Sequence, residues 1–158
     1  MKIRQYSYFA LHSETMSALE MAALLPMDPD ETSVLGSKSA QHRIPRNHSW
    51  KIVRRSAESI DDQIEHLIAR VTPILPQLIS LTQRPDVRAG MQVVRIYNDS
   101  EGVHGAPDGT LWSEARTWPR PLGWHLSLPV LEFLVATGAE LDIDEYDWTD
   151  SETAAATS

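Results

Sequence analysis

The stretch PVLEFLVATGAELDIDEY, residues 129–146, joins a helical pattern to a strand pattern and decides the fold class. Pro129 suits the first turn of a helix, and Gly138 is the residue type that most often ends one. The residues between them are nearly all apolar, which predicts a helix over 130–137 that is covered on most sides and lies across a sheet. Apolar and acidic residues then alternate over 141–146, so we expect a strand there.

Outward from this stretch, the two ends of the chain follow the same pattern. A strand predicted over 122–128 precedes the helix, so the C-terminal end forms a β-α-β unit. At the N-terminal end, residues 2–11 alternate in hydropathy and predict a strand. A helix capped by Ser13 and ended by Pro26 follows, and residues 49–54 predict the next strand. The faces of the first strand are predicted to carry Ile3, Phe9 and Leu11 on one side and Tyr6 and Tyr8 on the other.

Between these units the sequence predicts a long helix and a further strand. Ser59 with Asp62 resembles a capping box, and apolar residues follow at helical spacing. Pro73 and Pro76 should then break or bend the helix. A strand is predicted over 91–97, and turn signals follow it.

The predicted order is therefore β-α-β-α-β-β-α-β, which favours a split-βαβ, ferredoxin-like α+β sandwich. With 158 residues the chain has the size of one compact domain. We assign that domain to residues 1–149 and expect the polar, small-residue tail 150–158 to be disordered.

Composition narrows the function classes. The chain has no cysteine, which excludes disulfides, thiolate nucleophiles and cysteine-ligated metals. No secretory signal and no apolar run of ~20 residues is present, so we expect a cytoplasmic protein without a membrane contact. The net charge of −8 makes nucleic acid an unfavourable partner for the surface as a whole.

The charges are distributed unevenly along the chain. Six cations and no acid lie between residues 33 and 57, and eight acids and no base lie from Glu132 onward. One explanation is internal: if strands 49–54 and 141–146 are neighbours, their opposite charges stabilise the pair modestly. The other is that the basic segment faces outward and binds an anion or an acidic partner. Its members are Lys38, Arg43, Arg46, Lys51, Arg54 and Arg55.

A second candidate surface is the segment with Trp112, Trp118 and Trp124, whose six-residue spacing fits no helix. Prolines and arginines lie between these rings, and Trp and Arg are the residues that most often anchor protein interfaces. The alternative is a loop pinned to its own domain by the three tryptophans.

No catalytic motif is present. The sequence lacks a G-x-S-x-G elbow, H-E-x-x-H, a Walker A sequence and G-x-G-x-x-G. A metal site could assemble from His42, His48 and the acidic C-terminal strand, although no two histidines have helical ligand spacing. We expect neither a metal nor a cofactor.

Four stretches together resemble a bacterial family, domain of unknown function 4279 (DUF4279). They are Tyr6-Ser7-Tyr8-Phe9, the helix that ends at Pro26, the Ser49-Trp50 step and the closing GAELDIDEY of residues 138–146. The resemblance covers nearly the whole chain, while residues 36–48 depart from the family pattern. The family has no established activity, and the resemblance implies a small adaptor or immunity-type protein rather than an enzyme.

We therefore expect a non-enzymatic protein-binding module of immunity or antitoxin type, whose acidic charge steers it onto a basic target. Its partner would be another protein, and the sequence leaves a homo-oligomer open. The alternative is a small-molecule or nucleotide-binding enzyme that combines segment 38–55 with His48, Asp142 and Asp144.

Overall fold

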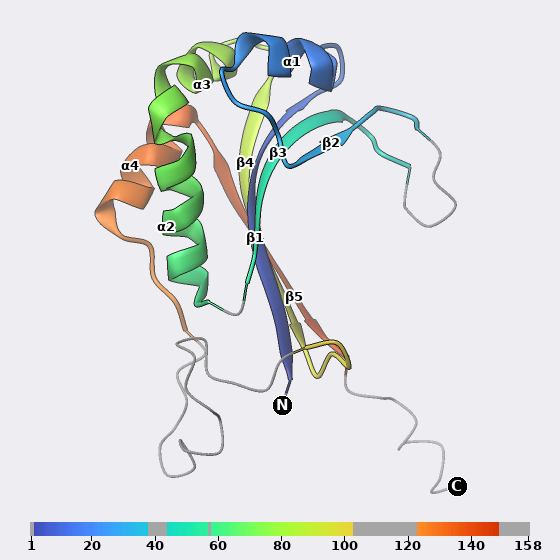
Figure 1. Cartoon of the computed structure of the whole chain (residues 1–158), viewed down its shortest axis with the longest axis vertical. Helices are drawn as coiled ribbons and strands as arrows, with labels where there is room; N and C mark the ends of the chain where they lie inside the picture. Colours follow the sequence, from blue (N-terminus) through green and yellow to red (C-terminus); the bar gives the residue numbers. More distant parts are fainter. Residues whose placement is uncertain (1, 38–43, 57, 103–122, 149–158) are drawn as a thin grey trace, which may run out of the picture.

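The computed structural model of the chain describes residues 2–37, 44–56, 58–102 and 123–148. Its centre is a five-stranded sheet with the order β2-β3-β1-β4-β5 (Figure 1). β1 pairs antiparallel with both β3 and β4, β2 pairs antiparallel with β3, and β4 and β5 are parallel. The strands are β1 Ile3–Ser13, β2 Glu31–Ser33, β3 His48–Arg55, β4 Arg88–Tyr97 and β5 Glu140–Asp147.

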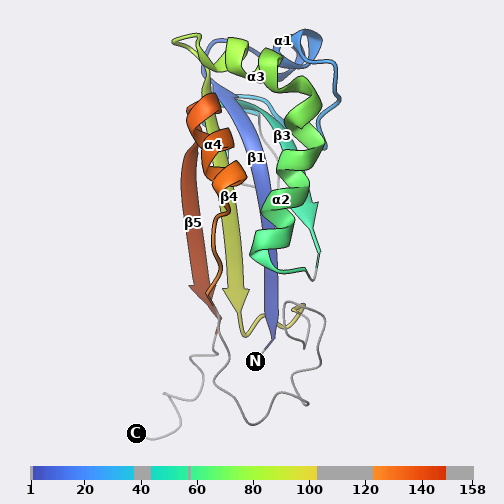
Figure 2. The ribbon, with the colours of Figure 1, turned by 90° about the vertical axis from the view of Figure 1, so that its left-hand side faces the viewer.

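The helices of the described chain lie against one face of this sheet (Figure 2). α2 and α4 lie along the strands, while α3 and α1 lie toward one end of the sheet (Figure 1). The helices are α1 Ala18–Leu24, α2 Ile60–Val71, α3 Leu75–Thr82 and α4 Leu128–Thr137.

The core forms between this helical layer and the inward side of each strand. Phe9 and Leu11 of β1 are fully buried there, as the alternation of β1 predicts. Phe9 contacts Phe133 of α4 edge-on, with ring centroids 5.3 Å apart. Burial of a side chain of this size stabilises the fold by roughly 1.5–3 kcal/mol. The neighbouring strands add Trp50, Ile52, Met91 and Val93 to the same layer.

α1 begins later than the sequence predicts. Its N-cap is Ser17, not Ser13: the Ser17 Oγ accepts a hydrogen bond from the Glu20 N–H, and the Glu20 carboxylate accepts one from the Ser17 N–H. Ser13 is instead the last residue of β1, and its Oγ accepts a hydrogen bond from the Met16 N–H in the connecting turn. The helix ends before Pro26, as predicted.

The long predicted helix and its break are confirmed. Ser59 caps α2 by accepting a hydrogen bond from the Asp62 N–H. At Pro73 the chain tightens into the 3₁₀ turn η1 Thr72–Ile74, and α3 starts directly afterwards with Pro76 in its first turn. Proline is tolerated there because the first N–H groups of a helix have no partner within it.

α4 ends at Thr137 as predicted, but it begins at Leu128 rather than at Val130 and is less buried than predicted. Gly138 ends the helix with φ +61°, in the left-handed region. Only one side of α4, including Phe133, packs into the core. Leu128 and Val135 are 67% and 82% exposed, so the expectation that this helix is covered on most sides is wrong.

The order of elements differs from the predicted one at two places. Residues 123–127 form no regular structure and Leu128 already belongs to α4, so the strand predicted over 122–128 is wrong. β2 has no counterpart in the predicted order, because three residues are too few for a recognisable alternation. The α+β class is confirmed. The ferredoxin-like order is not, because β4 and β5 are direct neighbours and β1 is antiparallel to β3.

The two remaining expectations concern the chain as a whole. The tail 150–158 lies outside the described residues, and the assignment of residues 1–149 to one domain stays a prediction. Across the described ranges, none of the helices has the length and apolar character needed to cross a membrane.

Candidate functional site

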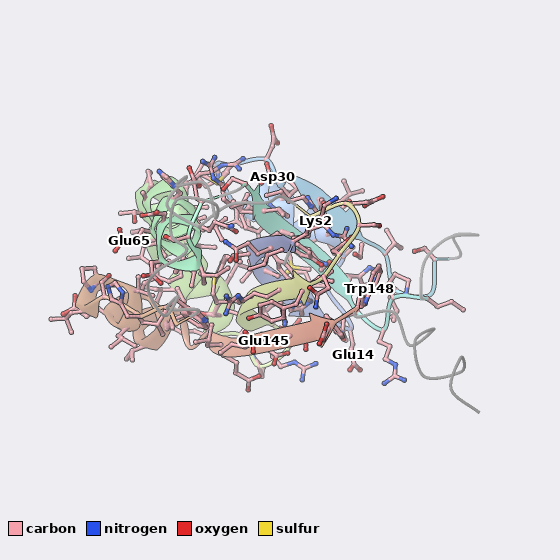
Figure 3. The ribbon with its side chains drawn as sticks, turned by 90° about the horizontal axis from the view of Figure 1, so that it is seen from below. Lys2, Glu14, Asp30, Glu65, Glu145 and Trp148 are labelled. Carbon is pink, nitrogen blue, oxygen red and sulfur yellow. The ribbon has the colours of Figure 1, made fainter. Side chains whose placement is uncertain are left out.

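The side of the sheet opposite the helices is the most distinctive surface of the molecule. No helix of the described chain lies over it (Figures 1 and 2). We call this side the open face; β1, its central strand, places Tyr6, Tyr8, Ala10 and His12 on it. Seen from below, α2 and α4 again lie together on the other side of the strands (Figure 3).

Two tyrosines form a strip along the middle of the open face. The rings of Tyr6 and Tyr8 stack with centroids 6.5 Å apart, and both side chains are partly exposed. A cation from β3 covers each ring: the Lys51 Nζ lies 4.8 Å from the Tyr8 centroid, and the Arg55 guanidinium lies 5.4 Å from that of Tyr6. Such contacts contribute about 0.5–1 kcal/mol each at exposed sites. Burial raises the pKa of the Tyr8 hydroxyl, with Tyr6 and then Asp144 adding to the shift.

Carboxylates border the tyrosine strip on the side of β5. Asp142 and Asp144 point to the open face, where Gln92 of β4 donates a hydrogen bond to Asp144 over 3.2 Å. Tyr146 follows on the same side and is 47% exposed. The Asp144 carboxylate raises the pKa of the Tyr146 hydroxyl, because a second negative charge beside it is unfavourable.

Polar and basic side chains gather at the end of the open face where β1 reaches His12, away from Tyr6. The strand register sets Ser49, His12 and Arg88 in one row across β3, β1 and β4. Lys51 stands in the next row, beside the small residue Ala10. We call the group of Ser49, His12, Arg88 and Lys51 the basic end.

Two hollows adjoin the basic end, and His12 lines both. The hollow on the β4 side has about 180 Å³ and also touches Arg88 and Asp142. The hollow on the β3 side has about 350 Å³ and also touches Arg46 and Lys51. Burial lowers the pKa of the His12 imidazole, and the nearby charges of Lys51 and Arg88 lower it further. His12 is therefore a neutral imidazole between two cations at neutral pH.

The predicted basic segment divides between two environments. Arg46 and Lys51 line the larger hollow and form no ion pair with a described carboxylate. Arg54 instead donates two hydrogen bonds to the Glu58 carboxylate, 2.9 and 2.6 Å long, and Arg55 pairs with Glu31 at 2.7 Å. The Arg54 guanidinium and the Ser56 hydroxyl lower the pKa of Glu58 to about 2. Lys38 and Arg43 lie outside the described residues.

The structure excludes pairing between strands β3 and β5 as the explanation for this charge distribution. β3 and β5 are not neighbours, because β1 and β4 stand between them. For the same reason the alternative enzyme site, with His48 beside Asp142 and Asp144, is not brought together. His48 lies at the start of β3, where its Nδ1 accepts a hydrogen bond from the Leu35 N–H over 3.2 Å.

The tryptophan segment is described at one position only. Trp124 is partly buried and packs against the hydrophobic core, which agrees with the structural alternative for that residue. Trp112 and Trp118 lie outside the described residues. An exposed tryptophan that the sequence reasoning missed is Trp148, directly after β5 (Figure 3). Its ring lies 6.0 Å from the Arg4 guanidinium of β1.

No metal centre is found among the described side chains, which include no cluster of three or more His, Asp or Glu residues arranged to hold an ion. His42, one of the histidines considered as a ligand, lies outside those residues. The open face instead presents stacked rings, the cations Lys51 and Arg88, which form no ion pair with a described carboxylate, and separate carboxylates.

Over the described residues, the chain is an α+β structure in which the helices lie on one side of a five-stranded sheet. The chain belongs to the family described as Domain of unknown function (DUF4279), whose model matches residues 2–148. This match confirms the family to which the sequence motifs pointed. No curated protein and no solved structure matches the chain.

Proposed function

We propose that this domain is a non-catalytic binding protein that contacts a partner protein with the open face of its sheet. The observation that carries the proposal is the tyrosine strip of Tyr6 and Tyr8, which stays partly exposed at the centre of that face. Tyrosine is enriched at protein interfaces because its ring supplies apolar area and its hydroxyl a hydrogen bond.

The charges around the strip determine what partner would fit. Lys51 of β3 stands on one side of the strip, and Asp142 and Asp144 of β5 stand on the other, so a complementary surface carries acidic groups toward β3 and basic groups toward β5. Separated charges of this kind fix the orientation of a complex and suppress wrong partners. The net charge of −8 adds long-range attraction toward a basic target, which supports the narrower role of an immunity- or antitoxin-type inhibitor.

The test compares two variants with the unmodified protein in affinity capture from the native host. Tyr6→Thr/Tyr8→Thr removes the rings while keeping a residue type that favours strands. The matched control is Val135→Gln on α4, which removes an 82% exposed apolar side chain from the helical side. We expect a stoichiometric partner with the unmodified protein and with the control, and its loss with the double variant.

Two outcomes would contradict the proposal. One is a partner that the double variant retains with unchanged affinity, because that partner would not use the tyrosine strip. The other is a partner lost equally with Val135→Gln, which would place the interface on α4. Circular dichroism of each variant separates a lost contact from a lost fold.

A further inference from the structure

Two arginines beside the hollows differ from the other arginines of the described chain. Arg88 and Arg46 form no ion pair with a described carboxylate, and both line the hollows beside His12. Each of the other described arginines does form one; these are Arg4, Arg54, Arg55, Arg70, Arg84 and Arg95. In a chain with more acids than bases, unpaired arginines at one place indicate a site that is kept free for an outside anion.

A buried hydroxyl in the same hollow is also without a partner. The Ser49 side chain is only 2% exposed, lines the larger hollow, and its Oγ has no hydrogen-bond partner in the described chain. Most buried hydroxyls are paired, because an unsatisfied one has lost its hydrogen bonds to water without replacement. An oxygen acceptor in the hollow would satisfy Ser49 together with the Lys51 ammonium.

The positions of the carboxylates decide which side of His12 an anion would occupy. Glu140 and Asp142 line the smaller hollow on the β4 side, where they would repel a second negative charge. Among the described residues that line the larger hollow on the β3 side there is no carboxylate, and they include Arg46, Lys51 and Ser49. The favourable position is therefore the β3 side, with His12 at its inner boundary.

We infer that the larger hollow binds an oxyanion of the phosphate class, held by Lys51, Arg46 and the Ser49 hydroxyl next to His12. A phosphate group suits this set because it carries up to two charges and presents several acceptor oxygens, while Lys and Arg form charge-assisted hydrogen bonds to it. A carboxylate offers one charge and two oxygens to the same donors. The occupant is either free phosphate or a phosphoryl group on a small ester, and neither requires the partner protein proposed above.

Titration of the purified protein with inorganic phosphate, followed by NMR, tests this site. Sodium chloride at matched ionic strength serves as the reference, because exposed charges respond to screening alone. We expect saturable shifts of the Ser49 and Lys51 amide signals and of the His12 imidazole, with a dissociation constant on the order of 1 mM. A parallel titration with O-phosphoserine distinguishes the sources: saturation there shows that the site accepts esters, and its absence restricts the site to the free ion.

Three variants make the test specific. Lys51→Met keeps the apolar stem and should weaken phosphate binding about tenfold, since a hydrogen bond to a charged group is lost. Ser49→Ala should weaken binding about threefold without lowering thermal stability, because its hydroxyl has no partner to lose. Lys2→Met is the matched control: the Lys2 ammonium contacts the Ser100 carbonyl far from the hollow and should leave the affinity unchanged.

Several results would overturn the inference. They are an absence of saturable shifts, shifts that chloride reproduces at the same ionic strength, or an equal loss of affinity with Lys2→Met. If Lys51→Met fails to fold, Ser49→Ala still tests the inference. A phosphate affinity that Ser49→Ala leaves unchanged would show that the Ser49 hydroxyl does not bind phosphate. The purified chain alone is used throughout, so failure here leaves the protein-binding proposal to its own test.

Discussion

The Lys51 ammonium lies 4.8 Å above the centre of the Tyr8 ring, which links the basic residues of β3 to the tyrosine strip of β1. Ala10 is the residue directly opposite Lys51, and the Lys51 ammonium reaches past this small side chain to the Tyr8 ring. In this position the charge acts on both Tyr8 and His12. The aromatic and the basic parts of the open face are therefore one continuous surface.

This relationship predicts how Lys51→Met changes His12. Burial is the larger cause of the lowered His12 pKa, and the Lys51 charge is the next. Removal of that charge should raise the pKa of His12 part of the way toward its ordinary value of about 6.5. NMR titration of the imidazole in both proteins measures it. An unchanged or lower pKa in Lys51→Met would show that the ammonium does not act on His12.

Local patterns in the sequence predict one part of this surface well. The alternation in β1 correctly separates Tyr6 and Tyr8 from Phe9 and Leu11, because side-chain direction in a strand repeats every two residues. Caps and prolines likewise locate α2 and its break, since each acts within one helical turn.

The assembly of the basic end could not be predicted, because it depends on which strands are neighbours. His12 and Arg88 meet only through the β1–β4 register, and no local signal in the sequence specifies that pairing. The density of cations over residues 33–57 does not show by itself which of them form ion pairs within the chain. Arg54 and Arg55 are adjacent in β3, but the alternation of the strand sends one to Glu58 and the other to Glu31 on β2.

Arg54 and Arg46 should therefore respond differently to substitution. Arg54→Ala removes both hydrogen bonds to Glu58, so the pKa of Glu58 should rise from about 2 toward its ordinary value of about 4.3. Stability at neutral pH should fall slightly, because a depressed carboxylate pKa contributes stability that is present above the unfolded pKa. Arg46→Ala should change neither quantity. Urea unfolding and NMR titration of Glu58 check both, and an equal fall in the two variants would contradict this division.

The one-sided packing of α4 gives a second pair of substitutions. Phe133 is 4% exposed and contacts Phe9, so Phe133→Ala should cost about 3–5 kcal/mol of unfolding free energy. Val135 is 82% exposed, and Val135→Ala should stay within about 0.5 kcal/mol of the unmodified protein. Chemical denaturation measures both. A large loss with Val135→Ala would mean that the outer side of α4 is covered in solution.

The end of α4 provides a test of backbone strain without steric conflict. Gly138 has φ +61°, and an added Cβ would meet nothing within 4 Å, so Gly138→Ala should cost about 1 kcal/mol through the left-handed conformation alone. Gly90 in β4 is the control. An added Cβ there meets only the Glu140 carbonyl oxygen at 3.9 Å, and Gly90→Ala should be neutral within about 0.5 kcal/mol. Equal losses for the two would contradict the assignment of strain to Gly138.

The lowered pKa of His12 also makes stability depend on pH. His12 faces Ser49 and Lys51 on β3 and Arg88 on β4, while Asp142 lines the hollow at its side. Burial and the two cations make protonation in the folded state unfavourable, whereas the unfolded chain protonates near the ordinary pKa of about 6.5. Stability should therefore fall as the pH drops below that value, because the unfolded state then binds more protons than the folded one.

Thermal unfolding of the unmodified protein and of His12→Gln between about pH 7.5 and about pH 5.5 measures this contribution. The window lies above the range in which carboxylates such as Glu58 are protonated, so acid unfolding does not interfere. We expect the melting temperature of the unmodified protein to decrease more steeply than that of His12→Gln. Equal slopes would show that His12 titrates alike in both states. A steeper decrease in His12→Gln would mean that protonated His12 stabilises the fold, and that the two cations do not determine its charge.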